Sequence, residues 1–422
     1  MTDWAARVLD EVDAAADVTE ARLAALVAVP SISGTDPEHE IQALLAADLA
    51  AAGLETDHWR LPLDELLAAP DFPGVEVHRD EAWGLVGRLP GTGDGATLML
   101  NGHIDVVPVG DPAAWTTPDP FSGRVVDGEL HGRGSCDMKA GLVAALAAVT
   151  ALRRAGVPLR GDVLLACVPG EEDGGLGTYA TLRRGWTADA CVVPEPTSLD
   201  LVTANAGALT FRLTVPGRAT HASRRSDGVS AIEKLVPVLA ALGRLESDRN
   251  RDVDALMARW TLAYPLSIGK VQAGDWASSV PDLLIAEGRL GVALDEPVED
   301  ARAALDHAVA EVSAEDPWLR DHPVTVQWWG GQFASGRLPA DSDLADRMSA
   351  AHTAVATGTP SRWGAPYGSD LRLLVGAGIP TLHYGPGDAV LAHAPDERVP
   401  LTEVHTAARA LALLALDVCG TA

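Results

Sequence analysis

Positive charge is scarce in this chain, which has 32 Lys and Arg residues against 59 Asp and Glu residues and a formal net charge of -27. An acidic excess of this size repels phosphate groups and anionic lipids, so we expect no nucleic acid and no membrane as partners. Hydrophobic residues make up 47% of the 422 residues, enough to bury a large core without disulfide or metal staples. We therefore expect a folded protein that acts on a small molecule.

Cysteine is also scarce, and long hydrophobic runs are missing. The four cysteines, Cys136, Cys167, Cys191 and Cys419, show no paired spacing, which is typical of a reducing compartment. The N-terminal segment lacks a basic stretch followed by an apolar one, and no later stretch runs for about 18 residues without a charge or a helix breaker. These absences predict a soluble protein that is not exported, and hence a cytoplasmic location.

Apolar runs that alternate with helical stretches predict the main fold. Two amphipathic helices are expected around 17–29 and 36–52. From residue 96 onward, short apolar runs are separated by segments with helical spacing, and a last run follows at 378–387. This alternation favours an α/β fold, with a mostly parallel sheet that has helices on its faces.

Between residues 206 and 331 the pattern changes. Three apolar runs and two helical stretches follow one another here, at 209–217, 228–242, 283–294, 298–312 and 324–330. With a further strand at 265–271, the order becomes β-α-β-β-α-β, the split arrangement of ferredoxin-like domains. We predict that this α+β unit, 206–331, is inserted into a larger domain made of 1–205 and 332–422.

Acidic and histidine residues follow the predicted strands at the points where the strands end. In open α/β sheets, ligands bind beyond the carboxyl ends of the strands, so these side chains are expected at one edge of the sheet. Asp137 joins them from the start of a helix. The set is His103, Asp105, Asp137, Glu171, Glu172, Glu195 and His393.

Imidazole and carboxylate groups without thiolate form a donor set that suits zinc, or alternatively cobalt or manganese, in a hydrolytic site. Charge favours two divalent ions, because three carboxylates and one hydroxide would neutralise them in a partly desolvated site. A carboxylate has two oxygens, so Asp137 is the candidate bridging ligand. Each ion would then have one histidine and one glutamate as well; the ligand set is His103, Asp137, Glu172, Glu195 and His393.

Two further carboxylates have predicted roles beside the metals. Asp105 lies two residues from His103, where it could accept the other imidazole N–H and orient the ring. Glu171 lies next to a predicted ligand and could exchange a proton with water and with a leaving amine. That role requires a raised pKa of Glu171.

Each of these residues also has a simpler interpretation. Asp137 precedes a long helical run, so it could be a helix N-cap. His103 alone could be a hydrogen-bonded core histidine, and Glu171 and Glu172 alone could be solvated loop charges. Cys136 could be a thiol nucleophile, although a small apolar packing role is the ordinary one. Convergence at the strand ends favours the metal site.

Seven motifs run through nearly the whole chain: NGHIDVVP, Trp115 through Pro120-Phe121, DGELHGRGSCDMKAG, PGEEDGG, VVPEPTS, VPGRATHAS, and YGPG followed by AHAPDERV. In this order they resemble the signatures of the two-metal amidohydrolases, the family that includes acetylornithine deacetylase, succinyl-diaminopimelate desuccinylase, aminoacylase and glutamate carboxypeptidase. The resemblance implies the same five ligands, with Asp137 bridging. It also implies Glu171 as general acid and base and Asp105 as the orienting carboxylate.

The same resemblance implies roles for the inserted domain that the residues alone do not indicate. The domain would be a lid and a dimerisation surface, which predicts a homodimer. His221 would reach the substrate carbonyl, frequently from the partner subunit, and could stabilise an oxyanion. Arg289 would bind a substrate carboxylate, although an exposed strand arginine is an equally good interpretation.

The chain departs from the family pattern in two places. Relatives usually have Asp before the glutamate pair, where this chain has Gly170, and Asn before the Val-Pro of the lid, where it has Ser278-Ser279. The first departure bears on how Glu171 is tuned, and the second on contacts between lid and substrate. The resemblance also implies a cis peptide bond between Asp137 and Met138.

The sequence thus predicts a metal-dependent hydrolase that cleaves the amide bond of a small N-acyl amino acid or a similar N-acyl amine. A metallo-dipeptidase or carboxypeptidase using the same site is the alternative within enzymes. A non-catalytic binding or metal-storage protein is the alternative outside enzymes. A TIM-barrel amidohydrolase would have a His-x-His pair, whereas this chain has His103-x-Asp105.

Overall fold

The computed structural model describes residues 3–422, which form two compact units. The first unit comprises the chain up to Thr203 together with 337–363 and 370–422. The second comprises 204–336 together with 364–369. The second unit thus covers 206–331, the predicted insertion, and also includes 204–205, 332–336 and 364–369, which the sequence pattern assigned to the larger domain.

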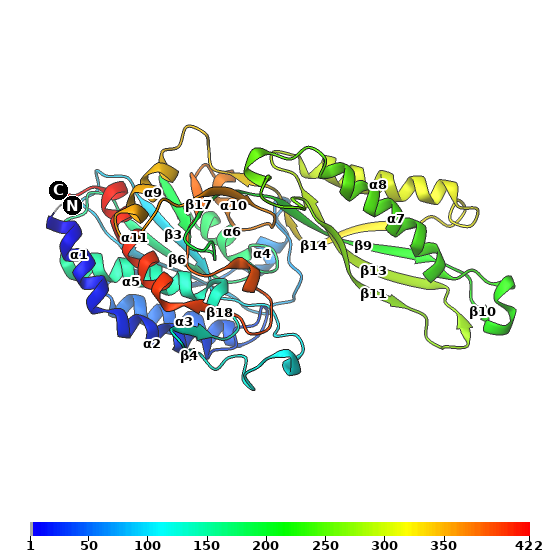
Figure 1. The fold of residues 1–422 in the computed structure, drawn as a ribbon, viewed down its shortest axis with the longest axis horizontal. Coiled ribbons are helices and arrows are strands. Elements are labelled where there is room, and N and C mark those ends of the chain that lie inside the picture. Colours follow the sequence, from blue (N-terminus) through cyan, green and yellow to red (C-terminus); the bar gives the residue numbers. More distant parts are fainter. Residues whose placement is uncertain (1–2) are drawn as a thin grey trace. The chain divides into compact units, whose positions relative to one another are not determined.

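A nine-stranded sheet organises the first unit (Figure 1). Its strands lie in the order β1 (Glu55–Arg60), β2 (Trp83–Leu89), β6 (Val163–Val168), β3 (Leu98–His103), β7 (Ala190–Val193), β17 (Thr381–His383), β8 (Leu201–Asn205) and β15 (Gly336–Arg337), with β16 (Arg362–Ala365) beside β8. The four central strands β6, β3, β7 and β17 are parallel, while β1, β2 and β8 pair antiparallel with their neighbours. The predicted α/β class is confirmed, and the sheet is more mixed at its edges than predicted.

Helices cover both faces of this sheet, which explains why its strands are continuous apolar runs. In β6, Leu165 belongs to one core and its neighbour Leu164 to the other. The first core packs against α1 (Asp3–Ala14), α2 (Ala16–Val27), α3 (Pro37–Ala51), α5 (Ala140–Ala155), α9 (Leu344–Thr353) and α11 (Leu401–Cys419). The second packs against α4 (Leu63–Leu67), α6 (Leu176–Arg183) and α10 (Leu371–Gly376). The predicted N-terminal helices correspond to α2 and α3, whereas α1 was not predicted.

The helix α5 is unusually apolar. Within the described residues, the segment Ser135–Ala155 is the one helix long and apolar enough to cross a membrane, and 83% of its most apolar window is buried in the protein. A core helix of a folded protein satisfies the same test. The position of α5 between α11 and the central sheet therefore accounts for its composition.

The second unit has the predicted β-α-β-β-α-β order. Its strands β11 (Leu266–Ala273), β13 (Leu283–Val292), β9 (Gly207–Pro216) and β14 (Thr325–Phe333) form an antiparallel sheet in that spatial order. The helices α7 (Ala231–Arg249) and α8 (Val298–Glu315) pack on one face, because alternate residues of β9 such as Phe211 and Leu213 join their core. A two-stranded pair, β10 (Thr220–His221) with β12 (Ser279–Val280), completes the unit.

A small three-stranded sheet connects distant parts of the first unit. It consists of β18 (Arg398–Pro400), β5 (Glu129–His131) and β4 (Arg124–Val126), all antiparallel. The pairing of β18 with β5 places the segment before α5 beside the segment before α11. Two of the predicted site residues, Asp137 and His393, lie on these two segments.

Candidate active site

Three neighbouring parallel strands bring the first group of predicted site residues to one edge of the sheet. His103 is the last residue of β3, Glu171 and Glu172 follow β6, and Glu195 follows β7. Because the three strands run in the same direction, their carboxyl ends meet at this edge. The side chains of His103, Glu171 and Glu195 are all more than nine-tenths buried.

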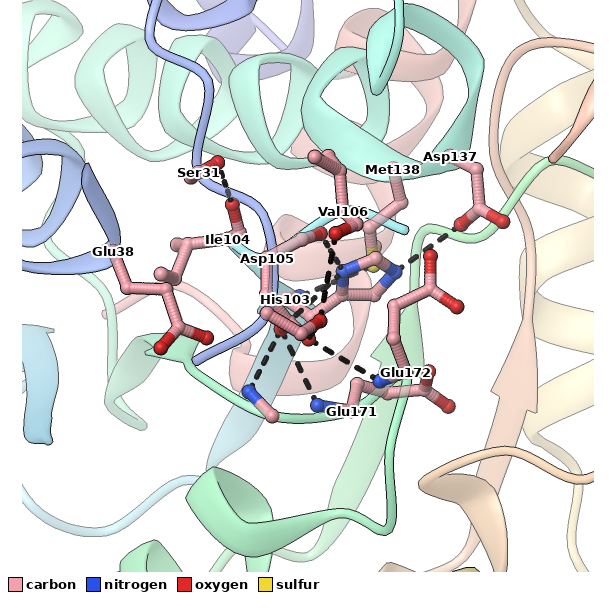
Figure 2. Close-up of polar contacts among 12 residues, drawn as sticks. Ser31, Glu38, His103, Ile104, Asp105, Val106, Asp137, Met138, Glu171 and Glu172 are labelled. Carbon is pink, nitrogen blue, oxygen red and sulfur yellow. Dashed lines mark hydrogen bonds and ion pairs between the residues drawn. The ribbon is translucent and has the colours of Figure 1, made fainter. Parts of the chain in front are cut away.

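Asp137 reaches the same place from the turn Ser135–Lys139, just before α5 (Figure 2). Its Oδ1 lies 3.1 Å from Nε2 of His103, and its Oδ2 lies 3.5 Å from Nε2 of His393. One carboxylate thus faces a different histidine with each oxygen. The Asp137-Met138 peptide bond is cis, as predicted.

His393 comes from the loop between β17 and β18 and is the most exposed member of the group. Its side chain is 52% exposed, and its backbone has a φ of 61°. Nε2 of His393 lies 3.0 Å from Oε2 of Glu172. His393, Glu172 and one oxygen of Asp137 therefore form one cluster of donors.

A second cluster lies on the other side of Asp137. Nε2 of His103 is 3.9 Å from Oε1 of Glu195. Although burial opposes ionisation of Asp137, hydrogen bonds from His103 and His393 hold its pKa below the usual range. The donor atoms of His103, Asp137 and Glu172 lie within 4.8 Å of one another, as do those of His103, Glu171 and Glu195. Groups of this size and composition fit divalent metal ions.

Asp105 differs from its predicted geometry. Nδ1 of His103 is 2.8 Å from the backbone oxygen of Asp105 and 3.8 Å from the carboxylate oxygen Oδ1. The imidazole ring of His103 is therefore oriented by the backbone carbonyl of Asp105.

The Asp105 carboxylate instead faces the loop 170–172, which follows β6 and is called the glutamate loop below. It accepts hydrogen bonds from the backbone N–H groups of Gly170, at 2.8 Å, Glu171, at 3.3 Å, and Glu172, at 3.4 Å (Figure 2). The first two bonds go to Oδ1, whereas Oδ2 accepts from Glu172 and also from the hydroxyl of Ser33 at 2.8 Å. Asp105 is fully buried, so these bonds are sheltered from water. The carboxylate thus holds in place the loop that carries the candidate proton-transfer group.

Glu171 has the environment that acid and base catalysis requires. Burial raises the pKa of its carboxyl well above the usual value, and the negative charges of Asp370 and Glu195 raise this pKa further. Asp370 is itself buried and accepts a hydrogen bond from the hydroxyl of Thr178 at 2.6 Å. A carboxyl group with a raised pKa can hold and release a proton near neutral pH.

Gly170, where the chain departs from the family pattern, lies against a buried ion cluster. Its φ is 72°, and a Cβ atom there would lie 3.2 Å from Oδ1 of Asp173 and 3.3 Å from Nη2 of Arg79. Arg79 donates to Asp173 at 2.9 Å and to both carboxylate oxygens of Glu38 at 2.9 and 3.0 Å. This cluster occupies the space that a side chain at position 170 would need.

Two of the simpler interpretations do not fit the geometry. The N-cap of α5 is Lys139, which makes no side-chain cap, and Asp137 lies in a non-helical part of the preceding turn. The Cys136 thiol is fully buried and donates to the backbone oxygen of Asp388, and burial raises its pKa well above the usual value. Cys136 therefore has the character of a packed residue rather than of a nucleophile.

The second unit carries His221 and Arg289. His221 is exposed, and its Nδ1 accepts from the backbone N–H of Ser223 at 3.1 Å and lies 2.8 Å from the Ser223 hydroxyl. With Nδ1 as acceptor, the neutral ring carries its proton on Nε2. Arg289 is exposed on β13, opposite Thr210 and Ser267, with its guanidinium 5.8 Å from the ring of Phe333.

The other departure from the family pattern lies beside His221. In the register of β10 and β12, His221 is opposite Ser279, and the N–H of Ala222 donates to the oxygen of Ser278 at 2.8 Å. The Ser278-Ser279 pair therefore belongs to the immediate surroundings of His221.

Several residues of this site were not predicted. They support the candidate donors through hydrogen bonds or charge: the partly buried Ser33 and the buried Arg79, Arg133, Asp370 and Glu397. Arg133 and Glu397 lie within two of the quoted motifs, DGELHGRGSCDMKAG and AHAPDERV, and this was the signal that could have found them. Their contacts join segments far apart in the chain, so neither motif alone indicates that the two residues pair.

The fold and the donor set define a hydrolase class that uses metal ions, and the family comparison agrees. The family model described as Peptidase family M20/M25/M40 matches residues 99–417. The chain belongs to this family, and it is a metal-dependent amidohydrolase.

Curated relatives and solved structures extend the comparison over the whole chain. The chain is 29% identical over 398 residues to N-formyl-4-amino-5-aminomethyl-2-methylpyrimidine deformylase of Bacillus subtilis, covering 86% of this chain and 85% of that one. It is 30% identical over 377 residues to succinyl-diaminopimelate desuccinylase of Leptothrix cholodnii, covering 86% and 90%. The fold is similar to that of a di-peptidase from Saccharomyces cerevisiae, with a TM-score of 0.79, 16% identity and 98% of each chain covered.

Proposed function

We propose that the protein removes the acyl group from a small N-acyl amino acid or a similar N-acyl amine, using two divalent metal ions. The observation that carries this proposal is the position of Asp137, whose two carboxylate oxygens face His103 and His393 separately. The names of the curated relatives, a deformylase and a desuccinylase, support removal of an acyl group from nitrogen.

The proposed ligands are His103, Asp137 and Glu195 for one ion, and His393, Asp137 and Glu172 for the other. Zinc is proposed because two imidazoles with carboxylates and no thiolate suit it, with cobalt or manganese as alternatives. When bound, the ions polarise the substrate carbonyl and lower the pKa of a water molecule.

Glu171 takes a proton from the attacking water and returns it to the leaving amine. Its burial and raised pKa support this role. His221, with a proton on Nε2, donates to the developing oxyanion, and Arg289 binds a substrate carboxylate through its guanidinium. The Asp105 carboxylate accepts hydrogen bonds from the backbone N–H groups of Glu171 and Glu172, and so fixes the positions of these two residues.

A substrate panel tests this function. N-formyl, N-acetyl and N-succinyl amines are compared with dipeptides, each assayed with zinc, cobalt or manganese and again after chelation. We expect hydrolysis of at least one N-acyl amine, lost on chelation and restored by metal. Faster cleavage of dipeptides favours the peptidase alternative, and no chelator-sensitive hydrolysis of any amide contradicts the proposal.

We also propose that the protein is a homodimer formed through the second unit. On α7, Ile232, Val236 and Leu239 are 50%, 62% and 43% exposed, and their spacing places them on one face of the helix. β11 is an edge strand of the same unit. An exposed apolar stripe beside an edge strand suits pairing with a second copy.

The oligomeric state tests the dimer. Sedimentation of the wild type is expected to show a dimer, and Val236→Asp is expected to give a monomer. Val18→Asp is a matched control, because Val18 is 66% exposed but lies on α2 of the first unit. A monomeric wild type, or a Val236→Asp variant that remains dimeric, contradicts the proposed surface.

A cytoplasmic location is proposed as well. The four cysteines are free and buried, which supports a reducing compartment. Fractionation of cells that express the full chain tests the proposal. Recovery with the secreted or membrane fraction contradicts it.

A further inference from the structure

A buried ion pair lies behind the candidate metal centre. Nη1 of Arg133 is 2.5 Å from Oε2 of Glu397, and these residues are 1% and 0% exposed. They are 264 positions apart in the chain. The proposed ligands do not include either residue. A buried ion pair is weak evidence for a stabilising role, because apolar residues of similar volume can often replace it without loss of stability.

The second carboxylate oxygen of Glu397, Oε1, contacts the backbone of the Asp137 turn. Oε1 accepts hydrogen bonds from the backbone N–H groups of Cys136, at 2.9 Å, and Asp137, at 3.0 Å. Glu397 therefore holds the main chain of the residue whose two oxygens face His103 and His393. Both N–H groups lie in the non-helical turn, where helix hydrogen bonds do not fix them.

Arg133 makes the reciprocal contact with the other segment. Its Nη1 also donates to the backbone oxygen of Ala394, the residue after His393, at 3.3 Å. The N–H of Gly132 donates to the backbone oxygen of Glu397 at 2.9 Å. The guanidinium lies 5.4 Å from the ring of Trp115, which covers it. The side chains of Arg133 and Glu397 thus join the Asp137 turn and the His393 loop from both sides, next to the pairing of β18 with β5 and the bond from Cys136 to Asp388.

The contacts of Arg133 and Glu397 lie beside the cluster that contains His393, and not beside the cluster of His103 and Glu195. His103 and Glu195 are located by β3 and β7 of the central sheet. His393 is on an exposed loop, and Asp137 is on an irregular turn. The ion that Asp137, Glu172 and His393 would bind therefore depends on how the Asp137 turn is connected to the His393 loop. The other ion depends on this connection less, because two of its proposed ligands, His103 and Glu195, are fixed by the sheet.

We propose that Arg133 and Glu397 are positioning residues that set the spacing between Asp137 and His393, and so determine the affinity for the metal ion bound by Asp137, Glu172 and His393. This inference rests on the proposed two-metal function. It assigns no chemical step to either residue. It predicts a selective loss of one of the two ions when the pair is altered.

Metal titration of the metal-free full chain tests the proposal without relying on turnover. Cobalt is added, and the visible absorption and calorimetric heat of each equivalent are recorded for the wild type and Glu397→Gln. The wild type is expected to bind two ions. In the variant, the second equivalent is expected to bind roughly 10- to 100-fold more weakly, the usual effect of an outer-sphere change, and the first to be unchanged.

Glu296→Gln is the matched control. Glu296 pairs with Arg249 through two contacts of 2.9 and 2.5 Å, but in the second unit. This variant is expected to lose thermal stability while binding both ions like the wild type. If Glu397→Gln also binds both ions like the wild type, or weakens both equally, the positioning role is wrong.

If Glu397→Gln does not fold, the same metal titration is carried out with Arg133→Lys. Lysine keeps the charge toward Glu397 but cannot also reach Ala394 in the fork geometry of the guanidinium. A smaller but still selective weakening of the second ion is expected, and a folded variant with two unchanged affinities overturns the proposal. A wild-type chain that binds no second ion is a separate result, because it overturns the proposed two-metal function and the inference with it.

Discussion

Most predicted site residues of the first unit, with the exception of the exposed His393, are built into the protein differently from those of the second. His103, Asp105 and Glu171 are buried, and their neighbours fix them through several contacts. His221 and Arg289 are exposed, and the side-chain contact of His221 is with Ser223 of its own turn. The first group is therefore preorganised by the fold, whereas the second can change with little cost to folding. Substitutions of the buried residues should lower both activity and stability where they break buried contacts, whereas substitutions of His221 and Arg289 should lower activity and leave stability unchanged.

The largest effect is expected for Glu171→Gln. Loss of the proton-transfer group should lower kcat roughly 10²- to 10⁴-fold, with the metal content unchanged. Kinetics on the best substrate of the panel, together with metal analysis, measure both quantities. Glu40→Gln is the control, because Glu40 is an exposed glutamate on α3. Full turnover by Glu171→Gln would show that this residue is not the acid and base.

His221→Ala should come next. Loss of an oxyanion donor lowers kcat by roughly 10²- to 10³-fold, while the melting temperature should not change because the side chain is exposed. Kinetics and thermal unfolding are measured together. His307→Ala is the control, since His307 is 74% exposed on α8 of the same unit. If His221→Ala lost much stability but no turnover, His221 would be a structural residue and the proposed oxyanion role would be wrong.

Asp105→Asn should affect both properties. The amide cannot accept all the hydrogen bonds from the glutamate loop, so the loop shifts; metal affinity and turnover should fall roughly 10- to 100-fold. The melting temperature should fall as well, because buried N–H groups lose their acceptor. Ser33→Ala removes one donor to the same carboxylate and should have a much smaller effect. An Asp105→Asn variant with unchanged stability would contradict the buried network.

Arg289→Lys should have the smallest effect. For a substrate that carries a carboxylate, loss of the bidentate contact should raise KM about tenfold, with kcat and stability unchanged. For a neutral N-acyl amine, no change is expected. KM values for such a matched pair of substrates measure the difference. Equal KM values for both substrates in wild type and variant would support the interpretation of Arg289 as an ordinary exposed arginine.

Much of the fold could be predicted because the patterns are local. The central strands are apolar runs that end in polar residues, and the β-α-β-β-α-β order of the second unit follows from its alternation. The helix Asp3–Ala14 was not predicted, and the antiparallel edge strands were not distinguished from parallel ones, because pairing direction depends on the path of the chain rather than on composition.

The candidate site was predictable to the extent that it follows strand ends. This reasoning found His103, Glu171, Glu172 and Glu195 from their positions after three strands. It did not predict that the Asp105 carboxylate turns toward the glutamate loop, because two residues of spacing do not determine which group faces the imidazole. It also missed Glu397, whose partner Arg133 is distant in the chain. His221 and Arg289 were available only through resemblance.

The loop that carries His393 has a consequence for the biosynthesis of the protein. Glu397 follows Asp137 by 260 positions in the chain, so it is synthesised much later than Asp137. During translation, the turn around Asp137 lacks the carboxylate that holds its N–H groups until residue 397 has left the ribosome. The donor cluster of Asp137, Glu172 and His393 therefore cannot form while the chain is shorter than 393 residues, even though β3, β6 and β7 are already present.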